Sequence, residues 1–269
     1  MRVRSLLIAL GINAVPAAGW FVGEWTAATT LVLYWLETLL GTVFLALRIL
    51  LHRYVRPTSG HYDYRAPQRQ APEGEDHSTY LSAFLVPALG FTFAHGLFLV
   101  VLLTMMSSRH LGAEATVNRE NLLTGLAGIA VFQLTDFAFD LVSLSDRSFA
   151  WLERLGQRTL GRVFVIHFTI IGGMVAVMFT GANRSFFGVF IFLKTLLNCG
   201  SLFPQWQPKT PPAWLSKVMD RIKDPKFKGT TFTEYWRQTD EQESARLAHN
   251  EEPLATGQDI RTRTPQIEP

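Results

Sequence analysis

Apolar residues along the chain gather into six long runs, and polar residues collect in the segments between and after them. Each run has about 18 to 27 residues, enough for an α-helix to cross the ~30 Å hydrocarbon layer of a bilayer. The pattern predicts an all-α polytopic membrane bundle within residues 1–206. Its six spans cover residues 5–22, 26–51, 80–106, 122–144, 163–180 and 186–203.

The polar segments predict the parts of the chain outside the bilayer. Residues 52–79 combine proline, glycine and charged residues and are expected to form a mobile cytoplasmic loop, whose His61 and His77 we interpret as solvated. Residues 207–223 carry apolar side chains at helical spacing beside lysine and arginine, which is typical of an amphipathic helix on a membrane surface. Residues 224–269 are polar and predict a largely disordered cytoplasmic tail.

Lysine and arginine set the orientation of the spans, because positively charged loops tend to stay on the cytoplasmic side. Arg2 and Arg4 precede the first span, and further basic residues follow the second, fourth and sixth spans. Both termini are therefore expected in the cytoplasm, which agrees with an even number of spans. A sequence pI near 9.1 is then explained by anionic lipid headgroups rather than by nucleic acid.

The first span also has features of a cleavable secretory signal. Arg2 and Arg4 precede a short apolar core, and residues 15–18 include the small side chains of a cleavage site. The apolar run continues to Val22, however, which is longer than the core of a signal requires. We therefore expect a retained helix.

Ionisable residues inside the predicted spans are the main functional clue. A charge near the bilayer centre costs roughly 2.5 to 3.5 kcal/mol on insertion scales, so such residues usually face a protein interior, a partner or a water-filled cavity. Counted along each helix, three of the six lie near the bilayer midplane and three lie nearer the cytoplasmic side. The first group is Glu37, His95 and Lys194, and the second is Asp136, Asp140 and His167.

Several of these residues share a helical face with a second polar residue, because residues three or four apart project from the same side of a helix. Two adjacent carboxylates repel each other when both are ionised. We therefore expect one of Asp136 and Asp140 to stay protonated, or both to face a cation such as Lys194. The shared faces pair Tyr34 with Glu37, Asp136 with Asp140, and Lys194 with Asn198.

Three hypotheses account for this polar interior. In the first, Lys194 pairs with Glu37 or Asp136 and only fixes the order of the helices. In the second, Glu37, His95 and Lys194 support transport of a proton, an ion or a small solute. In the third, the chain is a zinc-dependent hydrolase, with Glu37 acting on a water and with the zinc ligands His95, Asp136 and His167.

The sequence favours transport across the lipid bilayer over the other roles. The alternative is an accessory subunit that helps to assemble a membrane complex and therefore has a membrane-protein partner. Catalysis ranks behind both, because the chain has neither a His-Glu-x-x-His pair nor a Gly-x-Ser-x-Gly elbow.

Four short motifs occur in order along the spans: residues 34–37 (Tyr-Trp-Leu-Glu), residues 95–98 (His-Gly-Leu-Phe), His167 and the pair Leu193 and Lys194. Together they resemble an uncharacterised family of bacterial multi-span membrane proteins, over roughly residues 13–198. The resemblance implies a location in the bacterial inner membrane and supplies no established reaction or substrate. The family is more acidic near the position of Asn198, and this departure weakens the case for a lysine–carboxylate pair there.

Overall fold

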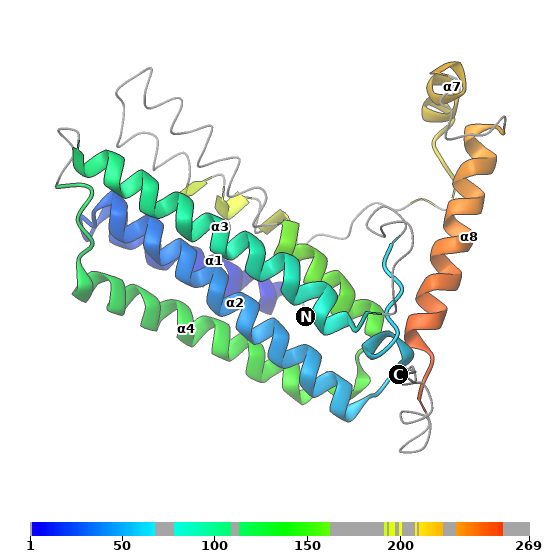
Figure 1. Cartoon of the computed structure of the whole chain (residues 1–269), viewed down its shortest axis with the longest axis horizontal. Helices are drawn as coiled ribbons and strands as arrows, with labels where there is room; N and C mark the ends of the chain where they lie inside the picture. The colour runs from blue at the N-terminus through cyan, green and yellow to red at the C-terminus, as the bar shows by residue number, and fades with distance from the viewer. Residues whose placement is uncertain are drawn as a thin grey trace, which may run out of the picture. The chain divides into compact units, whose positions relative to one another are not determined.

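The computed structural model describes residues 2–67, 78–108, 113–161, 191–192, 194–196, 199–200, 208, 210–222 and 230–254. Within these residues the fold is all helical, which confirms the all-α part of the predicted fold class (Figure 1). Residues 149–161 and the described residues between 191 and 200 are helical. The other helices are α1 (Arg2–Phe21), α2 (Ala27–Val55), α3 (Tyr80–Ser108), α4 (Arg119–Val142), α7 (Ala213–Ile222) and α8 (Phe232–Glu251), with short 3-10 helices η1 (Ser59–His61) and η2 (Leu144–Asp146).

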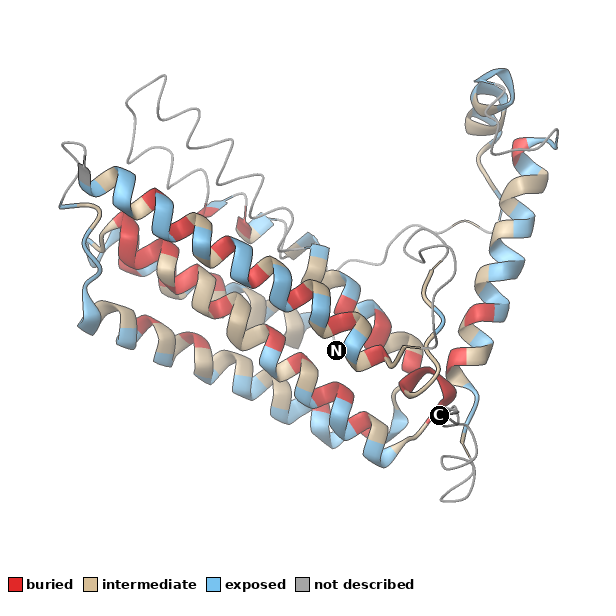
Figure 2. Cartoon of the chain, viewed as in Figure 1, coloured by how far each residue is buried: buried red, intermediate tan, exposed pale blue. Residues whose placement is uncertain are grey.

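Among the described residues, four helices are long and apolar enough to cross a membrane, and they correspond to the first four predicted spans. Large apolar side chains such as Val86, Phe93 and Val131 are more than 60% exposed on them. Figure 2 shows exposed positions interleaved with buried ones along α2, α3 and α4. Such a surface is compatible with a membrane location. The predicted fifth span, residues 163–180, and most of the sixth lie outside the described residues.

The chain divides into two compact units. The first unit contains α1, α2, nearly all of α3, α4 and the described residues of 151–203. The second unit contains residues 56–80 and 148–150 together with the described residues of the C-terminal part, including α7 and α8. Among the described residues, the polar residues predicted inside the spans belong to the first unit.

In the first unit, α4 packs along both α1 and α2. Glycines bring α1 and α4 close together, because a Cβ atom on Gly11 would overlap the ring of Phe132. A Cβ atom on Gly128 would lie 3.2 Å from the side chain of Val15. Small residues at helix crossings allow this close approach of two backbones in membranes.

Gly11→Ala is therefore expected to destabilise the bundle by about 1 to 3 kcal/mol, because the added methyl group overpacks the contact with Phe132. The measurement is the thermal unfolding midpoint of the purified protein in detergent. Gly90→Ala in α3 is the matched control, since among the described residues no atom of a neighbouring element lies within 4 Å of a Cβ there. Equal effects of the two variants would contradict the close α1–α4 crossing.

The loop before α4 holds the start of α2. The carboxylate of Glu114 accepts a hydrogen bond from the backbone N–H of Ala27 at 2.9 Å. The hydroxyl of Thr29 accepts one from the backbone N–H of Asn118, also at 2.9 Å. The first N–H groups of a helix have no partner within the helix, so the Glu114 contact satisfies one of them. It also fixes the start of the helix that carries Glu37.

In the second unit, residues 232–251 form α8 where the sequence predicts a disordered tail. Thr231 caps its N-terminus by accepting a hydrogen bond from the backbone N–H of Glu234, in the Thr-x-x-Glu spacing of a capping box. Arg237 forms ion pairs with Glu234 at 2.6 Å and with Glu241 at 2.5 Å. Such pairs support a helix whose apolar residues are few, and this corrects the prediction for these residues.

The last turns of α8 hold part of the predicted loop 52–79. The fully buried side chain of Asn250 accepts a hydrogen bond from the N–H of Arg65 and donates one to its carbonyl, each at 3.0 Å. Arg246 donates to the same carbonyl at 2.8 Å. The guanidinium of Arg246 also lowers the pKa of the Glu243 carboxyl, mainly through their hydrogen bond. The backbone of Arg65 in this loop is thus bonded to α8, contrary to the expected mobile segment.

His61 is buried, which corrects its interpretation as a solvated histidine. Its ring packs edge-on against Phe149, with the ring centroids 5.1 Å apart, and Tyr80 packs on the same phenyl ring. Glu251 accepts a hydrogen bond from the backbone N–H of Phe149 at 2.7 Å, where the helix of residues 149–161 begins. A carboxylate at this end of a helix is stabilising. His77 lies outside the described residues.

Candidate functional site

Glu37 and Lys194 form an ion pair in the interior of the first unit. The Nζ atom of Lys194 lies 2.6 Å from Oε2 of Glu37, and the two side chains are only 2% and 11% exposed. Glu37 comes from the middle of α2, and Lys194 comes from the helical residues between 191 and 200. Because an isolated buried charge is costly, each of the two groups stabilises the other.

Asn13 and Tyr34 complete the surroundings of the Lys194 ammonium. The Oδ1 atom of Asn13 in α1 accepts a hydrogen bond from Nζ at 3.2 Å. The same Nζ atom lies 4.1 Å from the centroid of the Tyr34 ring, where the negative face of the π system attracts a cation. We call Asn13, Tyr34, Glu37 and Lys194 the lysine cluster. It joins two helices of the N-terminal part to a segment more than 150 residues further along the chain.

Apolar side chains and one amide border the lysine cluster. Gln133 of α4 donates its side-chain N–H to the backbone carbonyl of Glu37 at 3.1 Å. An apolar environment strengthens the attraction between charges, since the local dielectric constant is low. Tyr34 also belongs to a buried core that contains Trp20, Ala27, Leu31, Leu99, Leu102 and Ile191.

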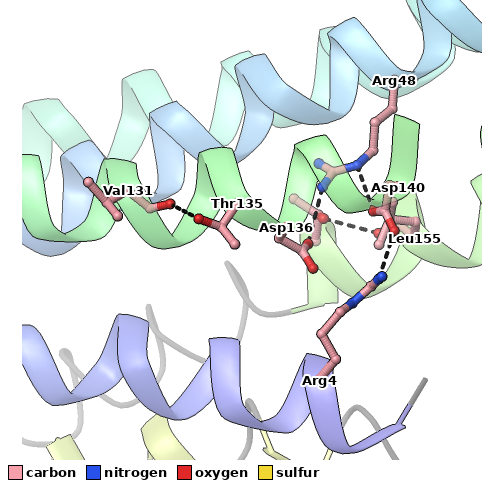
Figure 3. Close-up of polar contacts among 8 residues, drawn as sticks. Arg4, Arg48, Val131, Thr135, Asp136, Asp140 and Leu155 are labelled. Carbon is pink, nitrogen blue, oxygen red and sulfur yellow. Dashed lines mark hydrogen bonds and ion pairs between the residues drawn. The ribbon is translucent and has the colours of Figure 1, made fainter. Parts of the chain in front are cut away.

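A second charged group lies between α1, α2 and α4, and Figure 3 shows its side chains converging. Arg48 donates from Nε to Asp140 at 3.0 Å and from Nη2 to Asp136 at 3.1 Å. Arg4 donates to the other oxygen of Asp140 at 3.2 Å. We call these four residues the arginine cluster. Two guanidinium groups face two carboxylates, so its formal charge is zero.

The sequence predicts that one of the two aspartates stays protonated or that both face a cation such as Lys194. Asp136 and Asp140 do project from one side of α4 and do face cations, but the cations are Arg48 and Arg4. Sequence reasoning missed Arg48 because it lies near the end of the second predicted span, where a basic residue usually marks the cytoplasmic boundary. Its position inside residues 26–51 was the available signal, and the structure shows that it is only 6% exposed.

Of the other predicted site residues, His95 is buried in α3, one turn after Thr92. The carbonyl of Thr92 accepts a hydrogen bond from the indole N–H of Trp35 at 2.9 Å, which attaches α3 to α2 beside the lysine cluster. His167 and Asn198 lie outside the described residues.

The zinc hypothesis requires His95, Asp136 and His167 together. Asp136 is bonded to Arg48 instead. Within the described part of the chain, no group of three or more histidine, cysteine, aspartate or glutamate side chains could hold a metal ion.

Comparison with known protein families gives a match that covers both clusters. The model of a family described as "Family of unknown function (DUF6498)" matches residues 1–213. The chain belongs to this family. No curated protein and no solved structure matches it.

Membership in DUF6498 confirms the resemblance to an uncharacterised family that the sequence motifs indicate. Both the lysine cluster and the arginine cluster lie within the part that matches DUF6498. The match ends at Ala213, the first residue of α7. All but the first residue of α7, and the whole of α8, therefore lie outside the region that matches the family.

Proposed function

We propose that the chain is an integral membrane protein that transports a proton, an ion or a small solute, with the lysine cluster as the group that binds or relays it. The observation that carries this proposal is the buried contact of 2.6 Å between Nζ of Lys194 and Oε2 of Glu37. Ionisable residues inside membrane spans mark ion pathways and proton relays in pumps and transporters. The exposed apolar surfaces of α1 to α4 support the bilayer setting.

The lysine cluster has two ways to support transport. A proton moved from Nζ of Lys194 to Oε2 of Glu37 turns two ions into a neutral amine and a neutral acid that stay hydrogen-bonded. A cation that enters the interior can instead replace the ammonium at Glu37, while Asn13 and the Tyr34 ring still hold Lys194. His95, buried in α3, has an imidazole that suits proton exchange near neutral pH.

The proposal includes six spans, with both termini in the cytoplasm and the inner membrane of a bacterium as the location. The basic residues around the predicted spans support this orientation, because they follow the second, fourth and sixth spans. Four spans correspond to α1, α2, α3 and α4.

An accessory role in a membrane complex is the second candidate, and the arginine cluster favours it. Its four charges neutralise one another across α1, α2 and α4, and its cations are arginines, which stay protonated in proteins and do not exchange a proton. Such a cluster fixes helix order, as a scaffold requires. This role predicts a stable membrane-protein partner that is recovered in mild detergent.

Proton and ion flux into liposomes tests the proposal. The double variant Glu37→Gln/Lys194→Met keeps the interior neutral, so it should remain folded while losing the exchangeable groups. We expect the initial flux of the double variant to fall to that of protein-free liposomes. The wild type is expected to acidify the liposome lumen or to load it with the transported cation. Candidate monovalent cations are tested one at a time, each with a dye that reports lumenal pH or that cation.

Glu120→Gln is the matched control, since this carboxylate is exposed at the start of α4. Its flux should equal that of the wild type. A folded double variant that retains wild-type flux would overturn the role of the lysine cluster. A wild-type protein without flux that copurifies with a membrane partner would favour the accessory role.

A further inference from the structure

One face of α7 is exposed and carries a distinct pattern of side chains. Trp214, Val218 and Ile222 are four residues apart and are 67%, 48% and 58% exposed. Lys217 and Arg221 are exposed on the same side of the helix. Residues at i, i+3, i+4, i+7 and i+8 lie within one half of a helix surface. We call these five residues the outer face of α7, and Figure 2 shows that no residue of the helix is buried.

The opposite side of α7 is held by α8, within the same unit. Asp220 accepts a hydrogen bond from the backbone N–H of Phe232, the first residue of α8, at 2.6 Å. The hydroxyls of Ser216 and Thr233 are bonded at 3.3 Å. The polar positions of α7 are therefore used in contacts with α8. This arrangement fixes the rotation of α7 about its axis and leaves the mixed apolar and basic face outward.

We propose that the outer face of α7 docks in the headgroup region of an anionic membrane leaflet. Trp214, Val218 and Ile222 would enter the acyl boundary, and Lys217 and Arg221 would contact lipid phosphates. This division into an apolar stripe with basic neighbours is the pattern of interfacial amphipathic helices. Anionic lipids complement the two cations, each of which adds attraction near the surface.

The chain can bring α7 to that surface. Twelve residues separate Gly200, the last described helical residue before it, from Ala213. An extended chain of this length spans at most about 45 Å. Attachment to membrane spans also turns docking into an intramolecular event with a high effective concentration of lipid.

The size of the outer face argues against a protein partner as its occupant. A helix of ten residues is about 15 Å long, so one face covers far less than the roughly 800 Å² per partner of a stable interface. A bilayer requires no such minimum area, because the spans already hold the chain at its surface. The proposal does not depend on what the lysine cluster transports.

Lipid quenching in nanodiscs tests the docking of α7 in the full chain. Cys199→Ala removes the single cysteine, and Val218→Cys then carries an environment-sensitive fluorophore. Each nanodisc holds one copy of the protein. The discs are made of phosphatidylcholine, with or without anionic phosphatidylglycerol, and contain a lipid with a spin-labelled headgroup that quenches the fluorophore. We expect strong quenching at position 218 in the anionic discs only. A label on Asp240→Cys, an exposed position of α8, is the control and should stay unquenched.

Lys217→Gln/Arg221→Gln in the labelled protein is expected to lower the equilibrium constant for docking by about thirtyfold, or roughly fivefold for each lost cation. High salt should act in the same direction. Equal quenching at positions 218 and 240 would overturn the proposal. Discs that hold two copies give a second test. If the label at position 218 became buried only in those discs, the outer face of α7 would bind a second chain, and the proposal would be overturned.

Discussion

Glu37→Gln and Lys194→Met are each expected to lower the free energy of unfolding by about 3 to 5 kcal/mol, because each leaves one buried charge without its partner. The two side chains are 2% and 11% exposed, so water screens the remaining charge little. The double variant removes both charges and is expected to recover most of the loss. A double-mutant cycle on unfolding in detergent measures this coupling.

The exposed pair between Glu234 and Arg237 is the control for this cycle. Its N–O distance is also 2.6 Å, but the two side chains are 39% and 58% exposed. Solvent screens such a pair, so the coupling between Glu234→Gln and Arg237→Met is expected to be far smaller than that between Glu37→Gln and Lys194→Met. Additive effects of Glu37→Gln and Lys194→Met would contradict a direct stabilising contact in the bundle interior.

The cycle also separates the two proposed functions of the chain. A scaffold needs the ion pair only for stability, so a refolded double variant would perform as the wild type does. A transporter needs the groups themselves, so the same variant would be stable and inactive. Stability and flux therefore have to be measured on one protein preparation.

Much of the fold follows from the apolar pattern, because a bilayer demands continuous apolar helices of a certain length. The candidate spans Ala27–Val55 and Tyr80–Ser107 begin within one residue of their predicted starts. The membership of Glu37 and Lys194 in the polar interior also follows from the sequence, since a charge inside a span needs a partner. Their spacing from the span ends places them at similar depth.

The partners of the aspartates could not be derived in this way. Helical spacing shows that Asp136 and Asp140 share a face, but it does not show which neighbouring helix that face meets. The contact depends on α4 lying against both α1 and α2, which the close approach at Gly11 permits. Arg48 also lies near a span end, where a basic residue usually marks the cytoplasmic boundary.

The helix α8 was missed for a different reason. Its sequence lacks an apolar stripe, and low apolar content is the usual signature of disorder. Its stability comes instead from local ion pairs and from side chains that bind a backbone far away in sequence, such as Asn250 on Arg65. The first of these signals can be found in a sequence, through the Thr231 cap and the i, i+4 charges. The second depends on tertiary structure.

Arg48→Gln is expected to have an effect as large as the loss of the Glu37–Lys194 pair. The Arg48 guanidinium is bonded to both aspartates, and its side chain is only 7% exposed. Without it, Asp136 and Asp140 lie one turn apart as two carboxylates, and Arg4 is bonded to Asp140. Like charges at this spacing repel, and the guanidinium's own hydrogen bonds are lost. The yield of monodisperse protein in detergent and its unfolding midpoint measure the effect.

Two further variants test whether Arg48→Gln loses stability because charge neutralisation is lost. They are Arg4→Gln and the double variant Arg48→Gln/Asp136→Asn. Arg4 forms an ion pair with Asp140 and lies over the ring of Phe139. Its side chain is 29% exposed, so solvent replaces part of what it provides and a smaller effect is expected. Asp136→Asn removes one of the two repelling charges and is expected to restore part of the stability of Arg48→Gln. If the two arginine variants were equally stable and Asp136→Asn gave no rescue, charge neutralisation would not be what holds α2 against α4. The contact would then rest on packing at residues such as Phe137, which lies beneath the Arg48 guanidinium.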